Sequence, residues 1–135
     1  IIYCQTIKQC AVIYSTLKAE LGNKVYEDPT KPDPMKVVLE MLHACTPVTN
    51  KQNILDSFQK ENGCIKILVA TIAFGMGVDC KKVYHTIHFG PAKNVESYMQ
   101  ESGRAGRDGS PSIAYLVYQS YQLSQVEQEM KLYLN

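Results

Sequence analysis

The chain has 135 residues, a mass of 15.2 kDa and a formal net charge of +1, and 45% of its residues are hydrophobic. This is the size and composition of one globular domain with its own core, so disordered, collagen-like and coiled-coil chains are excluded. The near-neutral charge also excludes a basic surface over the whole domain. Any nucleic acid must therefore be bound by a local patch or with the help of a partner domain.

The cysteine pattern bears on the cellular compartment. The five cysteines are scattered and include no Cys-x-x-Cys pair: Cys4, Cys10, Cys45, Cys64 and Cys80. This pattern disfavours a disulfide framework or a zinc site, and it favours a reducing, intracellular compartment. We expect these thiols to be buried as small hydrophobic side chains.

The first half of the chain begins with an expected strand. The apolar run 1–4 is rich in β-forming residues, and because a domain seldom begins inside its own strand, we expect the chain to be part of a longer protein. Thr6 and Gln9 have the spacing of a capping box and predict a helix that stops at Gly22. Its buried stripe is expected to comprise Cys10, Ile13, Tyr14, Leu17 and Leu21.

The segment 27–47 contains four prolines and is predicted to be a proline-rich loop or insertion. Within it, 27–33 is expected to be an exposed loop. The segment 35–43 fits either a helix or a strand, and a helix that runs into a short strand is favoured. Thr49 and Gln52 repeat the capping signal and predict the start of a second helix.

Apolar runs in the second half predict three more strands, at 65–70, 83–89 and 113–118. Asn94 is expected to cap a helix that continues to about Ala105, and Ser124 is expected to cap a last helix. The buried face of that last helix is predicted to comprise Val126, Met130 and Leu134. Strands that alternate with helices at this spacing indicate an α/β fold with a parallel sheet covered on both faces.

An arginine pair among glycines is the first candidate site. Arg104 and Arg107 are three residues apart on one side of a predicted helical turn, and a planar guanidinium matches phosphate oxygens. Gly103 and Gly106 leave room for a phosphate to approach. We expect both guanidinium groups to face a nucleotide at the carboxyl edge of the sheet. The alternative is a solvated helix end in which Arg107 and Asp108 pair with their neighbours.

The segment 70–79 follows a predicted buried strand directly, so it lies at the carboxyl end of that strand, where open parallel sheets bind ligands. Gly75 and Gly77 permit unusual backbone angles. Thr71 offers a hydroxyl for a backbone phosphate, and Asp79 could accept hydrogen bonds from ribose hydroxyls. The alternative is a tight loop whose glycines serve its geometry alone.

Together these strings resemble the RecQ family of superfamily 2 helicases. The segments 1–6, 70–79 and 100–109 are similar to the family's fourth, fifth and sixth motifs, and the resemblance covers nearly the whole chain. The segment 41–46 departs from the Tyr-His-Ala-Gly-Leu string that is usual in the family. The resemblance implies a RecA-like three-layer sandwich, with residues 1–135 as the second, C-terminal lobe and an ATP site shared between two lobes.

The resemblance also implies roles for individual residues. Arg107 would be an arginine finger that reaches the γ-phosphate, and Arg104 would make a second contact to phosphate or to the other lobe. Further residues implied at the ATP site are Gln100, Gly103, Gly77 and Asp79. The residues implied along the nucleic acid are Thr6, Thr71, Phe74 and Gly75.

The chain has neither a Gly-x-x-x-x-Gly-Lys-Ser/Thr phosphate loop nor an Asp-Glu box. The resemblance therefore implies that ATP and Mg²⁺ are held mainly by an N-terminal RecA-like lobe of the same parent, and that the fragment alone is inactive. It also implies single-stranded and duplex DNA as partners, 3′ to 5′ unwinding, and a nuclear location in a eukaryote. No membrane association is expected.

Two alternatives stay open at this point. The first is a non-catalytic nucleic-acid-binding or interaction module that retains the lobe fold. The second is an RNA helicase of the DEAD-box kind, which is disfavoured because Gln100 and Glu101 stand where a His-Arg pair would be expected.

Overall fold

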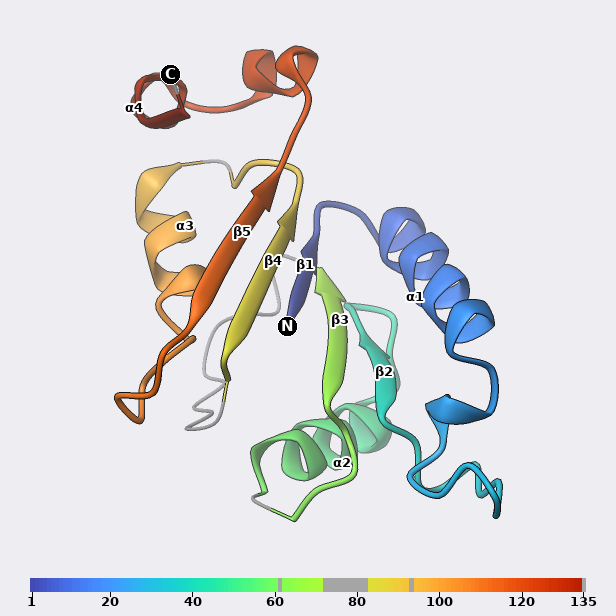
Figure 1. Cartoon of the computed structure of the whole chain (residues 1–135). Helices are drawn as coiled ribbons and strands as arrows, with labels where there is room; N and C mark the ends of the chain where they lie inside the picture. The colour runs from blue at the N-terminus through green and yellow to red at the C-terminus, as the bar shows by residue number, and fades with distance from the viewer. Residues whose placement is uncertain (61, 72–82, 93, 135) are drawn as a thin grey trace.

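A parallel sheet forms the centre of the molecule (Figure 1). The structure, a computed structural model, describes residues 1–60, 62–71, 83–92 and 94–134. Within these ranges the sheet has five strands in the order β2-β3-β1-β4-β5, and all neighbouring strands run parallel. The strands are β1 (Ile2–Cys4), β2 (Leu39–Leu42), β3 (Ile67–Thr71), β4 (His85–Phe89) and β5 (Ile113–Val117). The predicted α/β class with a parallel sheet is confirmed.

Helices cover both faces of this sheet, as expected (Figure 1). The α-helices are α1 (Ile7–Leu21), α2 (Val48–Gln59), α3 (Val95–Ser102) and α4 (Gln128–Leu134), and the 3₁₀ helices are η1 (Gly22–Val25) and η3 (Ser120–Gln125). None of the helices in the described ranges is long and apolar enough to cross a bilayer.

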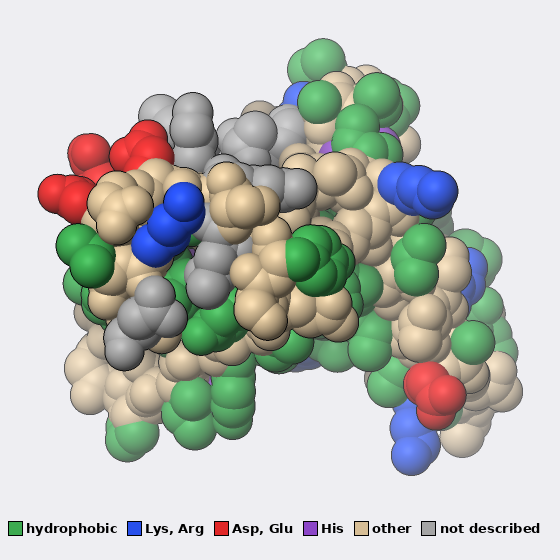
Figure 2. All heavy atoms as spheres, turned by 90° about the horizontal axis from the view of Figure 1, so that it is seen from above, with side chains coloured by type: hydrophobic (Ala, Val, Ile, Leu, Met, Phe, Trp, Pro, Cys, Tyr) green, Lys and Arg blue, Asp and Glu red, His purple; other side chains and the backbone are tan. Residues whose placement is uncertain are grey.

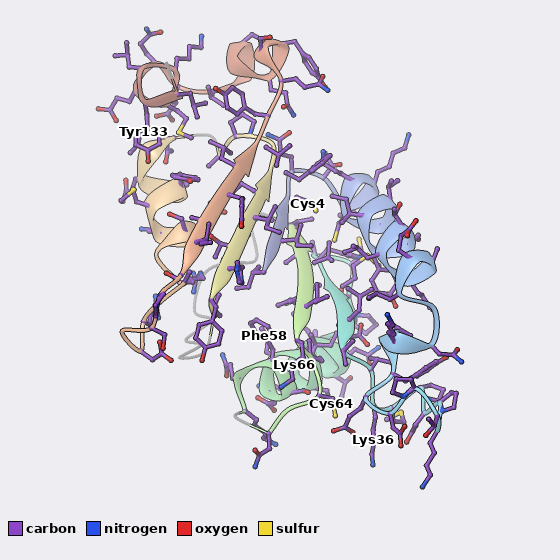
Figure 3. The ribbon with its side chains drawn as sticks, in the orientation of Figure 1. Cys4, Lys36, Phe58, Cys64, Lys66 and Tyr133 are labelled. Atoms are coloured by element: carbon purple, nitrogen blue, oxygen red, sulfur yellow. The ribbon has the colours of Figure 1, made fainter. Side chains whose placement is uncertain are left out.

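Alternation along the strands divides the core between the two faces. On one face α1 packs Cys10 against Cys4, Leu39 and Val69. On the other face α2 packs against the sheet, and Phe58 lies beneath β3 (Figure 3). The contacts on that second face join Ile54, Leu55 and Phe58 to Leu42, Leu68 and Ala70. The expectation that the strand near residues 65–70 is buried on both faces is therefore confirmed.

Two of the predicted helix caps form as expected. The Thr6 hydroxyl accepts a hydrogen bond from the Gln9 N–H at 3.1 Å, and Asn94 Oδ1 accepts one from the Ser97 N–H at 2.8 Å. At the end of α1, Gly22 takes a positive φ of 54°, which suits a glycine.

The predicted cap at Thr49 is wrong, because α2 already begins at Val48. Pro47 precedes the helix, and its carbonyl accepts a hydrogen bond from the Lys51 N–H at 2.8 Å. Its fixed φ suits a helix entrance, so a proline can start the helix without a side-chain cap.

The predicted end of α3 at Ala105 is also wrong, since the helix ends at Ser102. Gly103 has low helix propensity, and the Gly106 N–H turns away to bond Val83.

In the segment 27–47, the exposed loop and the short strand are confirmed, but the helix expected from residue 35 is wrong. Tyr26 and Val37 instead form an antiparallel bridge, and the Glu27 N–H donates to the Lys36 carbonyl at 2.7 Å. The loop closes on itself and leads straight into β2, because prolines between these residues remove helical hydrogen bonds.

The C-terminal helix lies on α3. The predicted cap at Ser124 is wrong, because a 3₁₀ helix occupies 120–125 and α4 begins at Gln128. The predicted apolar face is nevertheless confirmed, since Val126 and Met130 are buried with α3. Tyr133 lies against α3 (Figure 3), with its ring 5.7 Å from that of Tyr98.

The cysteines differ in exposure, which gives a testable prediction. Cys4 and Cys10 are fully buried, as expected, whereas Cys45 is exposed and contradicts that expectation. A hydrogen bond with Cys10, together with burial, raises the pKa of the Cys4 thiol, so its thiolate is disfavoured. We expect iodoacetamide to modify Cys45 in the native protein and to modify Cys4 and Cys10 only after unfolding, as read by peptide mass mapping. Equally fast labelling of Cys4 would contradict this.

Candidate functional site

Residues 103–107, the arginine loop, lie beside the amino ends of β4 and β5. The Gly106 N–H donates to the Val83 carbonyl at 2.8 Å, and the Ile113 N–H donates to the Tyr84 carbonyl at 2.9 Å. Val83 and Tyr84 directly precede β4. The expectation that the arginines lie at the carboxyl edge is therefore wrong. The reason is topological: α3 starts beyond the carboxyl end of β4 and returns along the sheet, so the loop after it emerges at the opposite edge (Figure 1).

The two arginines have different surroundings. Arg107 is exposed, whereas Arg104 is only 6% exposed. The expectation that both face outward together is wrong, because the chain leaves the α-helix at Ser102 and the three-residue spacing no longer places two side chains on one side. Gln100 and Gly103, which lie close to Arg107 in the sequence, are also exposed. Arg107 is therefore the better placed of the two arginines to contact a group outside this domain.

Gly106 has a conformational role in this loop. Its φ is +75°, a region that other residues rarely adopt. A Cβ atom at this position would lie 2.5 Å from Ser112 Oγ and 3.2 Å from the Ser110 carbonyl oxygen. Gly106 was expected to leave room for a phosphate, but its positive φ and the close Ser112 show that the loop itself needs a glycine here.

Asp108 helps to close the turn that follows. Its Oδ1 accepts a hydrogen bond from the Ser110 N–H at 2.9 Å, and this bond is the main reason that the pKa of the Asp108 carboxyl lies below its ordinary value. The carboxylate is therefore charged at neutral pH, and it stabilises the local turn through its bond to Ser110.

Thr6 and Thr71, two of the residues predicted along the nucleic acid, lie at the carboxyl edge of the sheet. Thr6 is exposed just beyond the carboxyl end of β1. Thr71 ends the neighbouring strand β3, opposite Cys4 in register, and is 7% exposed. The structure thus places Thr6 and Thr71 at the carboxyl ends of the adjacent strands β1 and β3, with only Thr6 open to solvent.

Gln5 and Gly90 also shape this edge and were missed from the sequence. The Gln5 side-chain amide donates to the Pro91 carbonyl at 2.9 Å. Gly90 has a φ of +104°, and a Cβ there would lie 2.7 Å from Gln5 Cδ. The Gly-Pro pair directly after a predicted strand was the available signal.

Four of the predicted site residues lie outside the described residues: Phe74, Gly75, Gly77 and Asp79. Their assignments stay predictions. In the sequence, the segment 72–82 joins Thr71 at the carboxyl edge to Val83 near the arginine loop. It therefore connects the two candidate regions along the chain.

A buried polar cluster beside the end of α3 was also missed. His88 Nε2 lies 3.4 Å from Glu101 Oε2, and both side chains are almost fully buried. Tyr3 stacks on His88, with ring centroids 4.8 Å apart. His85 is exposed whereas His88 is buried, in keeping with strand alternation, which puts residues three apart on opposite faces. Strand alternation could place His88 in the interior, but nothing in the sequence paired it with Glu101.

Among the residues that the structure describes, the side that Figure 2 shows carries no continuous basic patch. This view looks onto the carboxyl ends of the strands, and lysine and arginine side chains are separated there. In the part of the chain that the structure describes, no three His, Cys, Asp or Glu side chains are grouped to hold a metal ion.

Comparison with known proteins identifies one matching family. Residues 1–109 match the family described as the Helicase conserved C-terminal domain. The chain is 37% identical over 118 residues to the ATP-dependent DNA helicase hus2/rqh1 of Schizosaccharomyces pombe, covering 87% of this chain and 8% of that protein. It is 32% identical over 133 residues to the RecQ-like DNA helicase BLM of Xenopus laevis, covering 98% of this chain and 8% of that protein. The chain is also 41% identical over 118 residues to a putative ATP-dependent RNA helicase of Acanthamoeba polyphaga mimivirus. This match covers 87% of this chain and 18% of that protein.

Solved structures share the fold at lower identity. The helicase MrfA bound to DNA gives a TM-score of 0.71 at 24% identity, over 88% of this chain and 15% of that one. Domain 2 of the DEAD-box helicase Mss116p bound to an RNA duplex gives a TM-score of 0.68 at 21% identity. This match covers 85% of this chain and 40% of that one. These likenesses confirm the RecA-like lobe architecture. The chain spans 8% to 18% of the three curated relatives described above.

Proposed function

The chain belongs to the Helicase conserved C-terminal domain family, and on this basis we propose that it is the second motor lobe of an ATP-dependent DNA helicase of the RecQ type. The position of Arg107 supports this proposal beyond membership of the family. Arg107 is exposed on a loop that is fixed to the rest of the domain through the backbone of Gly106, its neighbour. A cation held in this way can serve a site completed by another lobe.

In this proposal Arg107 is the arginine finger of an ATP site between two lobes. The N-terminal lobe of the parent holds ATP and Mg²⁺, and closure of the lobes brings the guanidinium to the γ-phosphate. A preplaced charge stabilises the transferred phosphoryl group without reorganisation. Such fingers contribute about 10³- to 10⁵-fold in rate, or roughly 4 to 7 kcal/mol of the barrier.

The neighbours of Arg107 have supporting roles in this proposal. The exposed Gln100 and Gly103 would form the edge that meets the other lobe. Arg104 would contact phosphate or that lobe, and because it is buried here, the turn would have to open on closure of the lobes. Asp79 and Gly77 would complete the nucleotide site.

We place the DNA track at the carboxyl edge. Thr6 is exposed there, and Thr71 leads into the segment that contains Phe74 and Gly75. These contacts would be made mainly to phosphates, which makes binding insensitive to sequence and sensitive to salt. The net charge of +1 fits a lobe that shares phosphate neutralisation with its parent.

RNA unwinding is the second candidate function, because one curated relative carries the name of an RNA helicase. The RNA-bound Mss116p structure is 21% identical and supports the fold alone. Gln100 and Glu101, in place of a His-Arg pair, favour the DNA assignment.

Unwinding by the full-length parent tests this choice. We expect ATP-dependent separation of a duplex DNA with a 3′ single-stranded tail, with activity falling as salt rises. An RNA duplex of the same sequence should stay paired. Separation of RNA but not DNA would support the RNA assignment. DNA binding without ATP hydrolysis would instead support a non-catalytic module.

A further inference from the structure

A buried polar cluster fixes the last turn of α3 to the centre of the sheet. Glu101 is 5% exposed, and its carboxylate lies 3.4 Å from Nε2 of the fully buried His88 in β4. The Tyr3 hydroxyl, from β1, donates to the Glu101 carbonyl at 3.4 Å, and the Tyr3 ring stacks on His88. Glu101 thus meets two central strands, through a 3.4 Å contact of its side chain with His88 and a hydrogen bond of its backbone carbonyl with Tyr3.

Stability alone is a weak reason for such a cluster. Burying polar side chains costs desolvation, so a buried polar pair is often no more stable than apolar residues of the same volume. What the pair supplies is a defined distance between β4 and α3. The ring of Tyr98, from the same helix, also packs against His88, with centroids 4.9 Å apart.

The arginine loop is attached at both of its ends. At its start, the Arg104 N–H approaches the Glu101 carbonyl at 3.4 Å. At its end, the Gly106 N–H donates to the Val83 carbonyl at 2.8 Å. Arg107 follows the second attachment directly, so its position depends on both.

We propose that Glu101, held by His88, is a positioning residue that sets the place of Arg107. The proposal rests on the proposed function, in which Arg107 contacts the transferred phosphoryl group. A displacement of about 1 Å at a catalytic group can cost about 10²-fold in rate. Loss of the Glu101 carboxyl group should therefore lower turnover more than it lowers the affinity for ATP.

The test is Glu101→Gln in the full-length parent, because this change keeps the side-chain size and replaces the carboxyl group by an amide. We expect kcat for DNA-stimulated ATP hydrolysis to fall about tenfold while KM for ATP changes less than about twofold. Glu96→Gln is the matched control, since Glu96 is exposed in the first turn of the same helix, and it should leave both constants unchanged.

A double variant separates positioning from general loosening of the fold. If Glu101 acts through Arg107, then Glu101→Gln should cause no further loss in an Arg107→Ala background, measured with radiolabelled ATP so that slow turnover is resolved. A kcat within twofold of wild type, or an equal loss in both backgrounds, would overturn the inference. If thermal unfolding shows that Glu101→Gln does not fold, His88→Gln takes its place under the same criteria. Wild-type turnover of Arg107→Ala alone would overturn the proposed function itself.

Discussion

Arg107→Ala in the full-length parent is expected to lower DNA-stimulated ATP hydrolysis by about 10³- to 10⁵-fold. The guanidinium would act on charge that develops in the transition state, so its removal should leave the affinity for ATP nearly intact. Steady-state hydrolysis and equilibrium binding of a fluorescent ATP analogue measure the two effects separately. Because Arg107 is exposed, the substitution should leave the fold unchanged.

Two companion variants sharpen this test. Arg107→Lys keeps the charge but loses the planar fork, so we expect it to restore only a small part of the activity. Lys24→Ala removes an exposed cation from η1, far in sequence from the loop, and should behave as wild type. Wild-type turnover of Arg107→Ala would remove the finger assignment. An equal loss in Lys24→Ala would show that general surface charge matters instead.

Local signals in the sequence located most of the fold. Thr6 and Asn94 capped helices as expected, because a side-chain oxygen three residues before a backbone N–H is a local device. The helix expected from residue 35 did not form. Instead, Tyr26 and Val37 pair in an antiparallel bridge, and the prolines lie in the loop between them. That bridge depends on two segments meeting, which local patterns do not report.

The candidate site was predicted less completely than the fold. The Gly-Arg string was found, but its placement at the carboxyl edge failed because a helix that follows a parallel strand must return before the next loop begins. The difference in burial between Arg104 and Arg107 follows from the end of α3 at Ser102, three residues before the expected end. The contact of His88 with Glu101 joins residues from separate elements, and no spacing rule predicts such a pair.

Gly106→Ala is expected to have the second-largest effect, because it disturbs the loop immediately before Arg107. An L-residue at a φ of +75° is strained by about 1 to 2 kcal/mol, and the added methyl would lie 2.5 Å from Ser112 Oγ. A shift that relieves this contact weakens the 2.8 Å bond to the Val83 carbonyl, which contributes about 1 kcal/mol. We expect the free energy of unfolding to fall by about 2 to 3 kcal/mol, and kcat for ATP hydrolysis in the parent to fall by about 10- to 100-fold.

Gly109→Ala is the matched control for this prediction. Gly109 has a similar φ of +83°, but nothing lies within 4 Å of the position that its Cβ would take. It should therefore show the backbone strain of about 1 to 2 kcal/mol without the steric clash, and its kcat should stay near that of wild type. Adding Ser112→Ala to Gly106→Ala removes the nearest clashing atom and should restore part of the turnover. If Gly106→Ala and Gly109→Ala are equally active, the attachment of Gly106 to Val83 does not control the position of Arg107.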